Sequence, residues 1–161
     1  MCVLLAAALA VGACGFELRG EAATGLKTLF LSAAAPSAVA TDIRHILATG
    51  PTRVTPSESG AEAHLAILGD AREKTVHTIT GTGRVYDFRL RLVVRYQLTV
   101  PGREDPVIAP SEVSTTRLIT YSEAAPTAKE VEEQLLYKDM ERELAGRILR
   151  QIAIAKRGME R

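Results

Sequence analysis

The chain of 161 residues has no tryptophan and only two cysteines, Cys2 and Cys14. Aromatic residues make up only 4% of the sequence, which disfavours a surface that stacks nucleic-acid bases or sugar rings. Lys and Arg number 20 against 19 Asp and Glu, so a net charge of +1 provides no overall attraction to nucleic acid. Because both cysteines lie in the first fourteen residues, the rest of the chain has no disulfide, no thiolate metal site and no cysteine nucleophile.

The common catalytic and metal-binding motifs are missing as well. His45, His64 and His77 lie in three separate segments, and no H-x-x-H or H-E-x-x-H spacing occurs. No serine lies in a G-x-S-x-G turn, and Gly81-Thr82-Gly83 lacks the Lys-Ser/Thr pair of a phosphate-binding loop. We therefore predict that the protein is not an enzyme and uses neither a cofactor nor a metal.

The first fourteen residues are typical of a bacterial lipoprotein leader. An uncharged apolar run over residues 3–11 is followed by two small residues and then Cys14. The run is too short to span a bilayer, and a cysteine after small residues marks a lipobox whose thiol is acylated before cleavage. We predict a signal peptide over 1–13 and one domain over 14–161, with 157–161 as a disordered tail. A buried N-terminal helix or strand is the alternative, which the lack of a polar face disfavours.

Hydrophobic spacing predicts two helices and four strands. One helix is expected from Ser37 to Gly50-Pro51, and a longer one from the capping box Thr127–Glu130 to about Ala155, with an apolar stripe that begins at Val131. Strands are expected over 27–31, from 63 toward 79, over 86–100 and over 112–121, with 52–60 as a loop. The predicted fold is α+β: a two-layer sandwich with a mostly antiparallel or mixed four-stranded sheet and two helices on one face.

The strand over 86–100 has the strongest pattern in the chain. Every second residue from Tyr86 to Val100 is apolar, which indicates one buried and one solvated face. At ~3.3 Å per residue such a strand is about 50 Å long. The last predicted helix, at 1.5 Å per residue, is about 45 Å long. The two lengths match, so the helix can lie along the strand.

Basic residues are frequent on this strand and across the hairpin from it: Arg72, Lys74, Arg84, Arg89, Arg91 and Arg95. Three of them, Arg89, Arg91 and Arg95, project from the polar face of the strand, and Arg84 stands at its start. Guanidinium groups match phosphates and carboxylates, so this face is a candidate anion-binding surface. The alternative is an ordinary solvent-facing surface whose charges prevent association between sheets.

Several short motifs agree with one known family. After the lipobox comes Cys14-Gly15-Phe16-Glu17-Leu18-Arg19, and further motifs stand at 86–90 (YDFRL), 100–103 (VPGR) and 140–145 (MERELA). The first is similar to the Cys-Gly-aromatic-x-Leu-Arg mature start of the LptE family of lipopolysaccharide-assembly lipoproteins. In order and spacing, these elements resemble that family over nearly the whole mature chain.

The resemblance implies a non-enzymatic outer-membrane lipoprotein that faces the periplasm and is anchored through Cys14. Its implied partners are an LptD-type outer-membrane β-barrel, which it would plug, and lipopolysaccharide, which it would bind during assembly at the outer-membrane surface. The family fold is a sheet packed on two helices. By position, Lys129 and the 79–84 turn correspond to the family's basic residues at lipopolysaccharide, and Arg84 replaces the basic residue expected at Ile79.

The complete set of candidate residues for binding lipopolysaccharide or another anion is Arg84, Arg89, Arg91, Arg95 and Lys129. Their ligands are either lipid A phosphates or acidic residues of the barrel lumen, and no nucleic-acid partner is expected. Two other functions fit the residues. One is a generic periplasm-facing adaptor lipoprotein without a lipopolysaccharide role. The other is a lipid-anchored hydrolase, which the missing thiol and scattered histidines disfavour.

Overall fold

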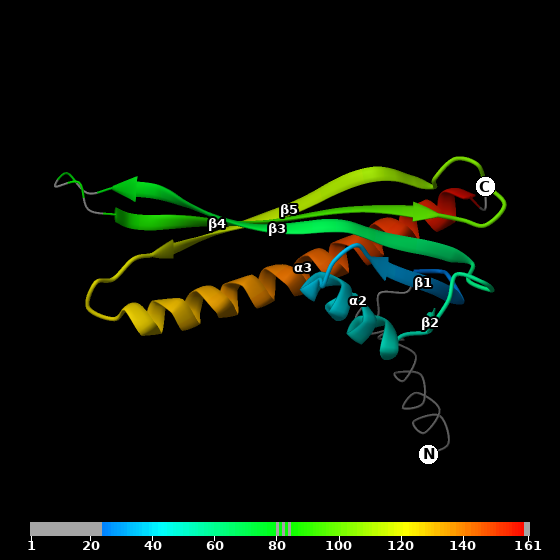
Figure 1. Cartoon of the computed structure of the whole chain (residues 1–161), viewed down its shortest axis with the longest axis horizontal. Coiled ribbons are helices and arrows are strands. Elements are labelled where there is room, and N and C mark those ends of the chain that lie inside the picture. Colours follow the sequence, from blue (N-terminus) through cyan, green and yellow to red (C-terminus); the bar gives the residue numbers. More distant parts are fainter. Residues whose placement is uncertain (1–23, 80, 82, 84, 160–161) are drawn as a thin grey trace, which may run out of the picture.

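Five strands form one sheet, and two helices cover one of its faces (Figure 1). The computed structural model describes residues 24–79, 81, 83 and 85–159. Along the chain the strands are β1 Thr28–Ala33, β2 Arg53–Thr55, β3 Ala63–Ile79, β4 Val85–Thr99 and β5 Ile108–Thr120. Their order across the sheet is β2-β1-β3-β4-β5. The helices are α2 Ala38–Ala48 and α3 Pro126–Met159. The predicted two-layer α+β fold is confirmed, with five strands rather than four.

The additional strand, β2, lies inside the segment that the sequence analysis assigns to a loop. It pairs in parallel with β1 over three residues, from Thr28 opposite Arg53 to Phe30 opposite Thr55. β1 is also parallel to β3, whereas the β3–β4 and β4–β5 pairs are antiparallel. A strand of three residues is too short to show alternation, and α2 supplies the crossover that parallel strands require.

The long strand β4 has the two faces that its sequence predicts. Its apolar face is buried beneath the helices, with Leu90, Val94 and Leu98 each 0% exposed.

β5 begins four residues earlier than predicted and includes Pro110. Since β5 is an edge strand, the missing N–H of a proline costs no ladder hydrogen bond on its outer side.

The helix boundaries follow the capping chemistry with one difference. The first helix begins where predicted, and Ser37 caps it by accepting a hydrogen bond from the backbone N–H of Ala40 at 3.1 Å. α3 begins at Pro126, and the Lys129 N–H donates to the Ala125 carbonyl, so Thr127 lies inside the helix rather than at its cap. Proline is favoured in the first helical position because it lacks the N–H that would be unpaired there.

α3 also ends later than predicted. It continues to Met159, so residues 157–159 form its last turn rather than part of a disordered tail. Residues 160–161 lie outside the described residues.

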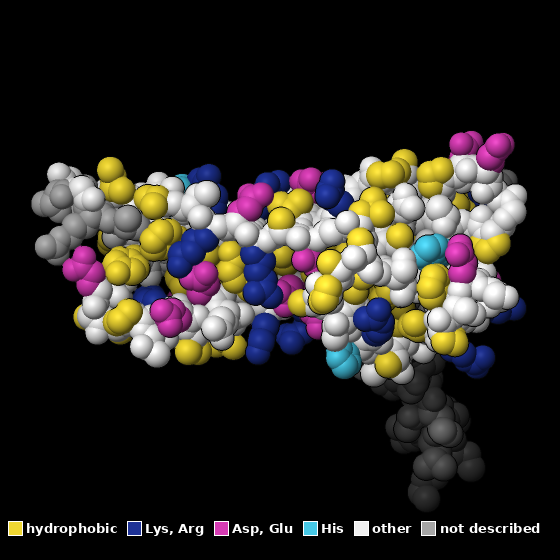
Figure 2. Space-filling view, in the orientation of Figure 1, with side chains coloured by type: hydrophobic (Ala, Val, Ile, Leu, Met, Phe, Trp, Pro, Cys, Tyr) yellow, Lys and Arg dark blue, Asp and Glu magenta, His cyan; other side chains and the backbone are white. Residues whose placement is uncertain are grey.

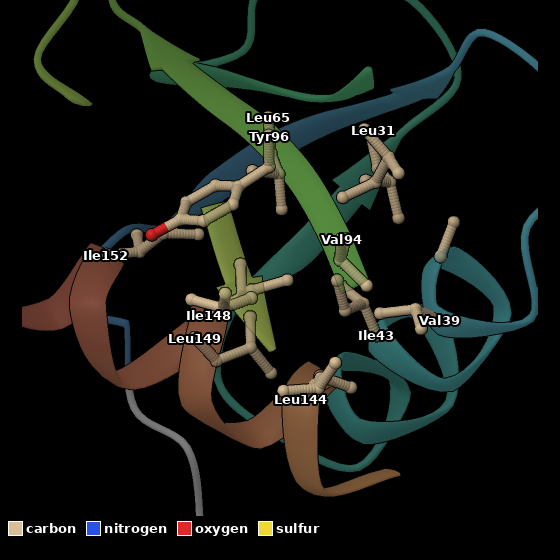
Figure 3. Packing of buried hydrophobic residues seen from close by; sticks show 14 of the residues in the cluster. Leu31, Val39, Ile43, Leu65, Val94, Tyr96, Leu144, Ile148, Leu149 and Ile152 are labelled. Carbon is tan, nitrogen blue, oxygen red and sulfur yellow. The ribbon is translucent and has the colours of Figure 1, made fainter. Parts of the chain in front are cut away.

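The hydrophobic core lies between the sheet and both helices. Val94 and Tyr96 of β4 meet Ile43 of α2 and Leu144 and Ile148 of α3, as Figure 3 shows. The sheet continues well beyond this core in one direction (Figure 1). We call the part that contains α2, β1, β2 and the core the proximal end. The distal end consists of 72–79 of β3, 85–89 of β4, 117–120 of β5 and 126–136 of α3.

Candidate functional site

The face of the sheet turned away from the helices carries the three predicted arginines of β4. Arg89 and Arg95 are exposed and Arg91 is half-buried, while the alternate residues Leu90 and Leu92 are buried on the helix-covered face. The prediction that Arg89, Arg91 and Arg95 share a solvated face is therefore confirmed. We call this surface the open face.

The three arginines of the open face differ in their partners. Arg91 is paired on both sides, with Glu73 of β3 and Glu112 of β5, each at 3.2 Å. Arg89 lies 2.8 Å from Nδ1 of His77. Within the described residues, Arg95 has no ion pair. Arg89 and Arg95 are consequently better placed to bind an external anion than Arg91, whose charge two carboxylates already balance.

Two other basic residues of the hairpin lie on the opposite face, which corrects their grouping with the arginines of β4. Arg72 is paired with Leu92 in register and forms an ion pair with Glu141 of α3. Lys74 forms one with Glu133 at 2.5 Å. The cause is a register shift after Ile67, because one extra residue in a strand moves all later side chains to the other face.

Lys129 is also separate from the open face. It stands in the first turns of α3, where its Nζ lies 2.8 Å from a carboxylate oxygen of Glu132. It lines a cavity of about 170 Å³ between the distal sheet and α3, together with Lys74, Phe88 and Tyr121. The five predicted anion-binding residues therefore do not form one site. Arg84 and Cys14 lie outside the described residues.

Apolar side chains are exposed around the distal end: Val76, Ile79, Tyr86, Leu118, Tyr121, Val131 and Leu135, at 41% to 60%. Figure 2 shows hydrophobic surface at this end of the molecule. Val131, predicted to start the buried stripe of α3, is 53% exposed, because the helix enters the core only at Tyr137. Exposed apolar patches mark interaction sites. This surface was not among the predicted sites, although apolar residues on both sides of a hairpin turn were a usable signal.

Ion pairs join the distal sheet to α3. Glu143 of α3 accepts hydrogen bonds from Arg117 at 2.6 Å and Arg147 at 2.7 Å. Burial acts to raise the pKa of Glu143, but the hydrogen bond and charge of Arg117, with Thr115 and Arg147, outweigh it and hold that pKa below its ordinary value. Glu143 therefore stays ionised and fixes the outer strand β5 to the helix.

The histidines and helices provide few other candidate features. His64 contacts Ser32 and Glu58, and His77 contacts Arg89, so each is part of a local polar cluster. No group of three or more His, Cys, Asp or Glu suited to a metal ion occurs in the described part of the chain. Over the same residues, neither helix has an apolar stretch long enough to cross a bilayer.

A lipopolysaccharide-assembly family model, LptE, matches residues 26–152, which include the whole core. The chain belongs to the LptE family. Curated LPS-assembly lipoproteins LptE from Yersinia pestis (strain Pestoides F) and Yersinia pseudotuberculosis (serotype O:1b, strain IP 31758) are both 27% identical to it over 150 residues. That alignment covers 91% of this chain and 71% of each relative. LptE membership supports a role in lipopolysaccharide assembly.

Solved structures show the same LptE-type fold. The solution structure of lipoprotein B from Nitrosomonas europaea is 28% identical, with a TM-score of 0.73, and covers 86% of this chain and 90% of its own. The crystal structure of rare lipoprotein B from Shewanella oneidensis has a TM-score of 0.74 at 23% identity and covers 83% and 99%.

Proposed function

We propose that the chain is a non-enzymatic outer-membrane lipoprotein that faces the periplasm, partners and plugs an LptD-type β-barrel, and binds lipopolysaccharide during its assembly at the cell surface. The family match over 26–152 is the observation that carries the proposal. Cys14 is its lipid attachment site. The exposed apolar distal end supports a protein partner, since exposed apolar patches of this kind mark interfaces.

The partnership is tested by affinity purification of the tagged full-length lipoprotein from detergent-solubilised outer membranes, followed by a salt wash. We expect a stoichiometric large β-barrel to remain bound. Replacing Ile79 by Ser at the distal end should reduce the amount of barrel retained. Ile154→Ser is the matched control, because Ile154 is equally exposed, at 61% against 60%, but lies at the other end of α3.

A purified chain without a barrel would contradict the partnership and leave the adaptor function in its place. Equal loss of barrel in both isoleucine variants would remove the distal end from the interface. A positive result in a broad esterase and peptidase screen of the mature domain would favour the hydrolase instead.

The arginines of the open face should contribute unequally to lipopolysaccharide binding, because their existing contacts differ. Arg89→Gln/Arg95→Gln should weaken binding of purified lipopolysaccharide by about tenfold or more, because charge-assisted hydrogen bonds contribute about 1.5–3 kcal/mol each. Arg91→Gln should have a smaller effect, since Glu73 and Glu112 already balance its charge. Lys138→Gln/Arg142→Gln removes two exposed charges of α3 and serves as the control. Unchanged binding in the Arg89/Arg95 variant would exclude these residues from the site.

The anchor is tested separately. Cys14→Ala should abolish incorporation of labelled palmitate and release the protein from the membrane fraction, while the domain keeps its far-ultraviolet circular dichroism spectrum. Labelling that persists in this variant would contradict attachment at Cys14.

A further inference from the structure

A depression at the proximal end takes no part in the surfaces discussed so far. It has a volume of about 810 Å³ and is bounded by the first residues of β1 and β2 and the last turn of α2. Its ten lining residues include three basic side chains, Lys27, Arg44 and Arg53, and no carboxylate. Leu47, Pro51 and Val54 are among the remaining lining residues.

The three cations are held together by the backbone. The Arg53 N–H donates to the Lys27 carbonyl at 2.9 Å, so Lys27, just before β1, stands beside the first residue of β2. Arg44 reaches the same depression from α2. All three side chains are exposed, and none forms an ion pair within the residues that the structure describes.

This arrangement contrasts with the basic residues that join the sheet to α3. Arg72, Lys74 and Arg117 each have a carboxylate partner on that helix. Three like charges around one hollow repel one another, and no acidic residue among the lining compensates them. An external anion would remove that repulsion, and guanidinium and ammonium groups with apolar neighbours suit a phosphate that carries a hydrocarbon chain.

The position of the depression indicates the source of the anion. Thr52, which lines the depression, hydrogen-bonds Thr24 through their Oγ1 atoms at 2.7 Å. Thr24 comes ten residues after Cys14. Ten residues span at most about 35 Å, so a lipid on Cys14 keeps this end of the domain close to the membrane surface.

We propose that the depression lined by Lys27, Arg44 and Arg53 binds the anionic phospholipid headgroups of the membrane that holds the anchor. It thereby holds the proximal end against the lipid surface. The inference rests on the proposed attachment at Cys14. It assigns the proximal end a membrane contact that is separate from the distal end and the open face.

The test is co-sedimentation with lipid vesicles of the complete chain from residue 14, carrying Cys14→Ser so that no lipid is attached. We expect binding to vesicles with about 30 mol% phosphatidylglycerol in phosphatidylcholine, no binding to phosphatidylcholine alone, and loss of binding at about 0.5 M salt, where charges are screened. Each removed basic residue should weaken binding about fivefold, so Lys27→Gln/Arg53→Gln should lose about 25-fold.

Lys138→Gln/Arg142→Gln is the matched control, because it removes the same charge from exposed positions of α3 and should bind within about twofold of wild type. Unfolding midpoints of all variants are compared, so that a folding defect is recognised. Absence of binding by wild type, or equal loss in both double variants, overturns the proposal. Retained vesicle binding by Lys27→Gln/Arg53→Gln with reduced barrel copurification would also overturn it and indicate a protein contact.

A chain that is not acylated at Cys14 can be distinguished from one whose depression does not bind headgroups. Palmitate labelling of the full-length chain reports attachment at Cys14, whereas sedimentation of the unlipidated chain reports the depression alone. A chain that is labelled but ignores anionic vesicles refutes this inference and leaves the proposed function intact.

Discussion

The proximal and distal ends share β3, β4, β5 and α3, but different interactions hold the sheet and the helix layer together at each end. At the proximal end, apolar side chains from both layers interlock, and Leu144 of α3 is 0% exposed (Figure 3). At the distal end, Leu135 of the same helix is 55% exposed, and ion pairs such as Lys74–Glu133 join the layers. The proximal end therefore stabilises the fold, and the distal end keeps apolar surface available for a partner.

The largest expected difference comes from one substitution made at both ends of α3. Leu144→Ala should lower the free energy of unfolding by about 2–5 kcal/mol, because it leaves a cavity in the core. Leu135→Ala should change it by less than about 0.5 kcal/mol, because the side chain is largely solvated. Urea unfolding monitored by circular dichroism measures both. Equal losses would mean that the distal half of α3 is packed as tightly as the proximal half.

A smaller effect should distinguish the helix-covered face of the sheet from the open face. Glu141 is only 5% exposed, and Arg72 balances its charge in an ion pair. Arg72→Ala leaves this buried carboxylate unpaired and should lower the free energy of unfolding by about 1–3 kcal/mol. Arg91→Ala on the open face should lower it by about 0–1 kcal/mol, since its two ion pairs are solvated. A larger loss from Arg91 than from Arg72 would reverse this ranking.

The smallest effect is a dependence on pH. The pKa of Glu143 is lowered in the folded chain from 4.5, so its contribution to stability is present above that value and is lost as pH falls through the lowered pKa. The stability difference between wild type and Glu143→Gln should therefore be larger at about pH 7 than at about pH 3. Parallel stability profiles across this range would show that the contacts with Arg117 and Arg147 add nothing to folding.

The parts of the fold with a sustained pattern were predictable. Alternation along β4 predicted both its length and the shared face of Arg89 and Arg95, because one buried and one wet face require period two. β2 was not predictable, since three residues between turn-forming neighbours carry no period. The faces of Arg72 and Lys74 depended on a register shift in β3 that composition does not mark.

The candidate site was only partly predictable for a related reason. Residues on one element, such as the arginines of β4, can be found from the sequence, but the depression joins Lys27, Arg44 and Arg53 from three separate segments of the chain. Its formation depends on the parallel pairing of β1 with β2, which brings Lys27 beside Arg53. Neither residue has a distinctive neighbour in the sequence that would indicate this contact.

The parallel position of β1 also has a consequence for the order of folding. β3 and β4 are separated by residues 80–84 only, whereas residues 34–62 separate β1 from its partner in β3. Short loops close fast and long ones slowly, so we expect the β3–β4 hairpin to form early and β1 to join the sheet late. In a chain tethered through Cys14, the segment nearest the tether would then be among the last to reach its native place.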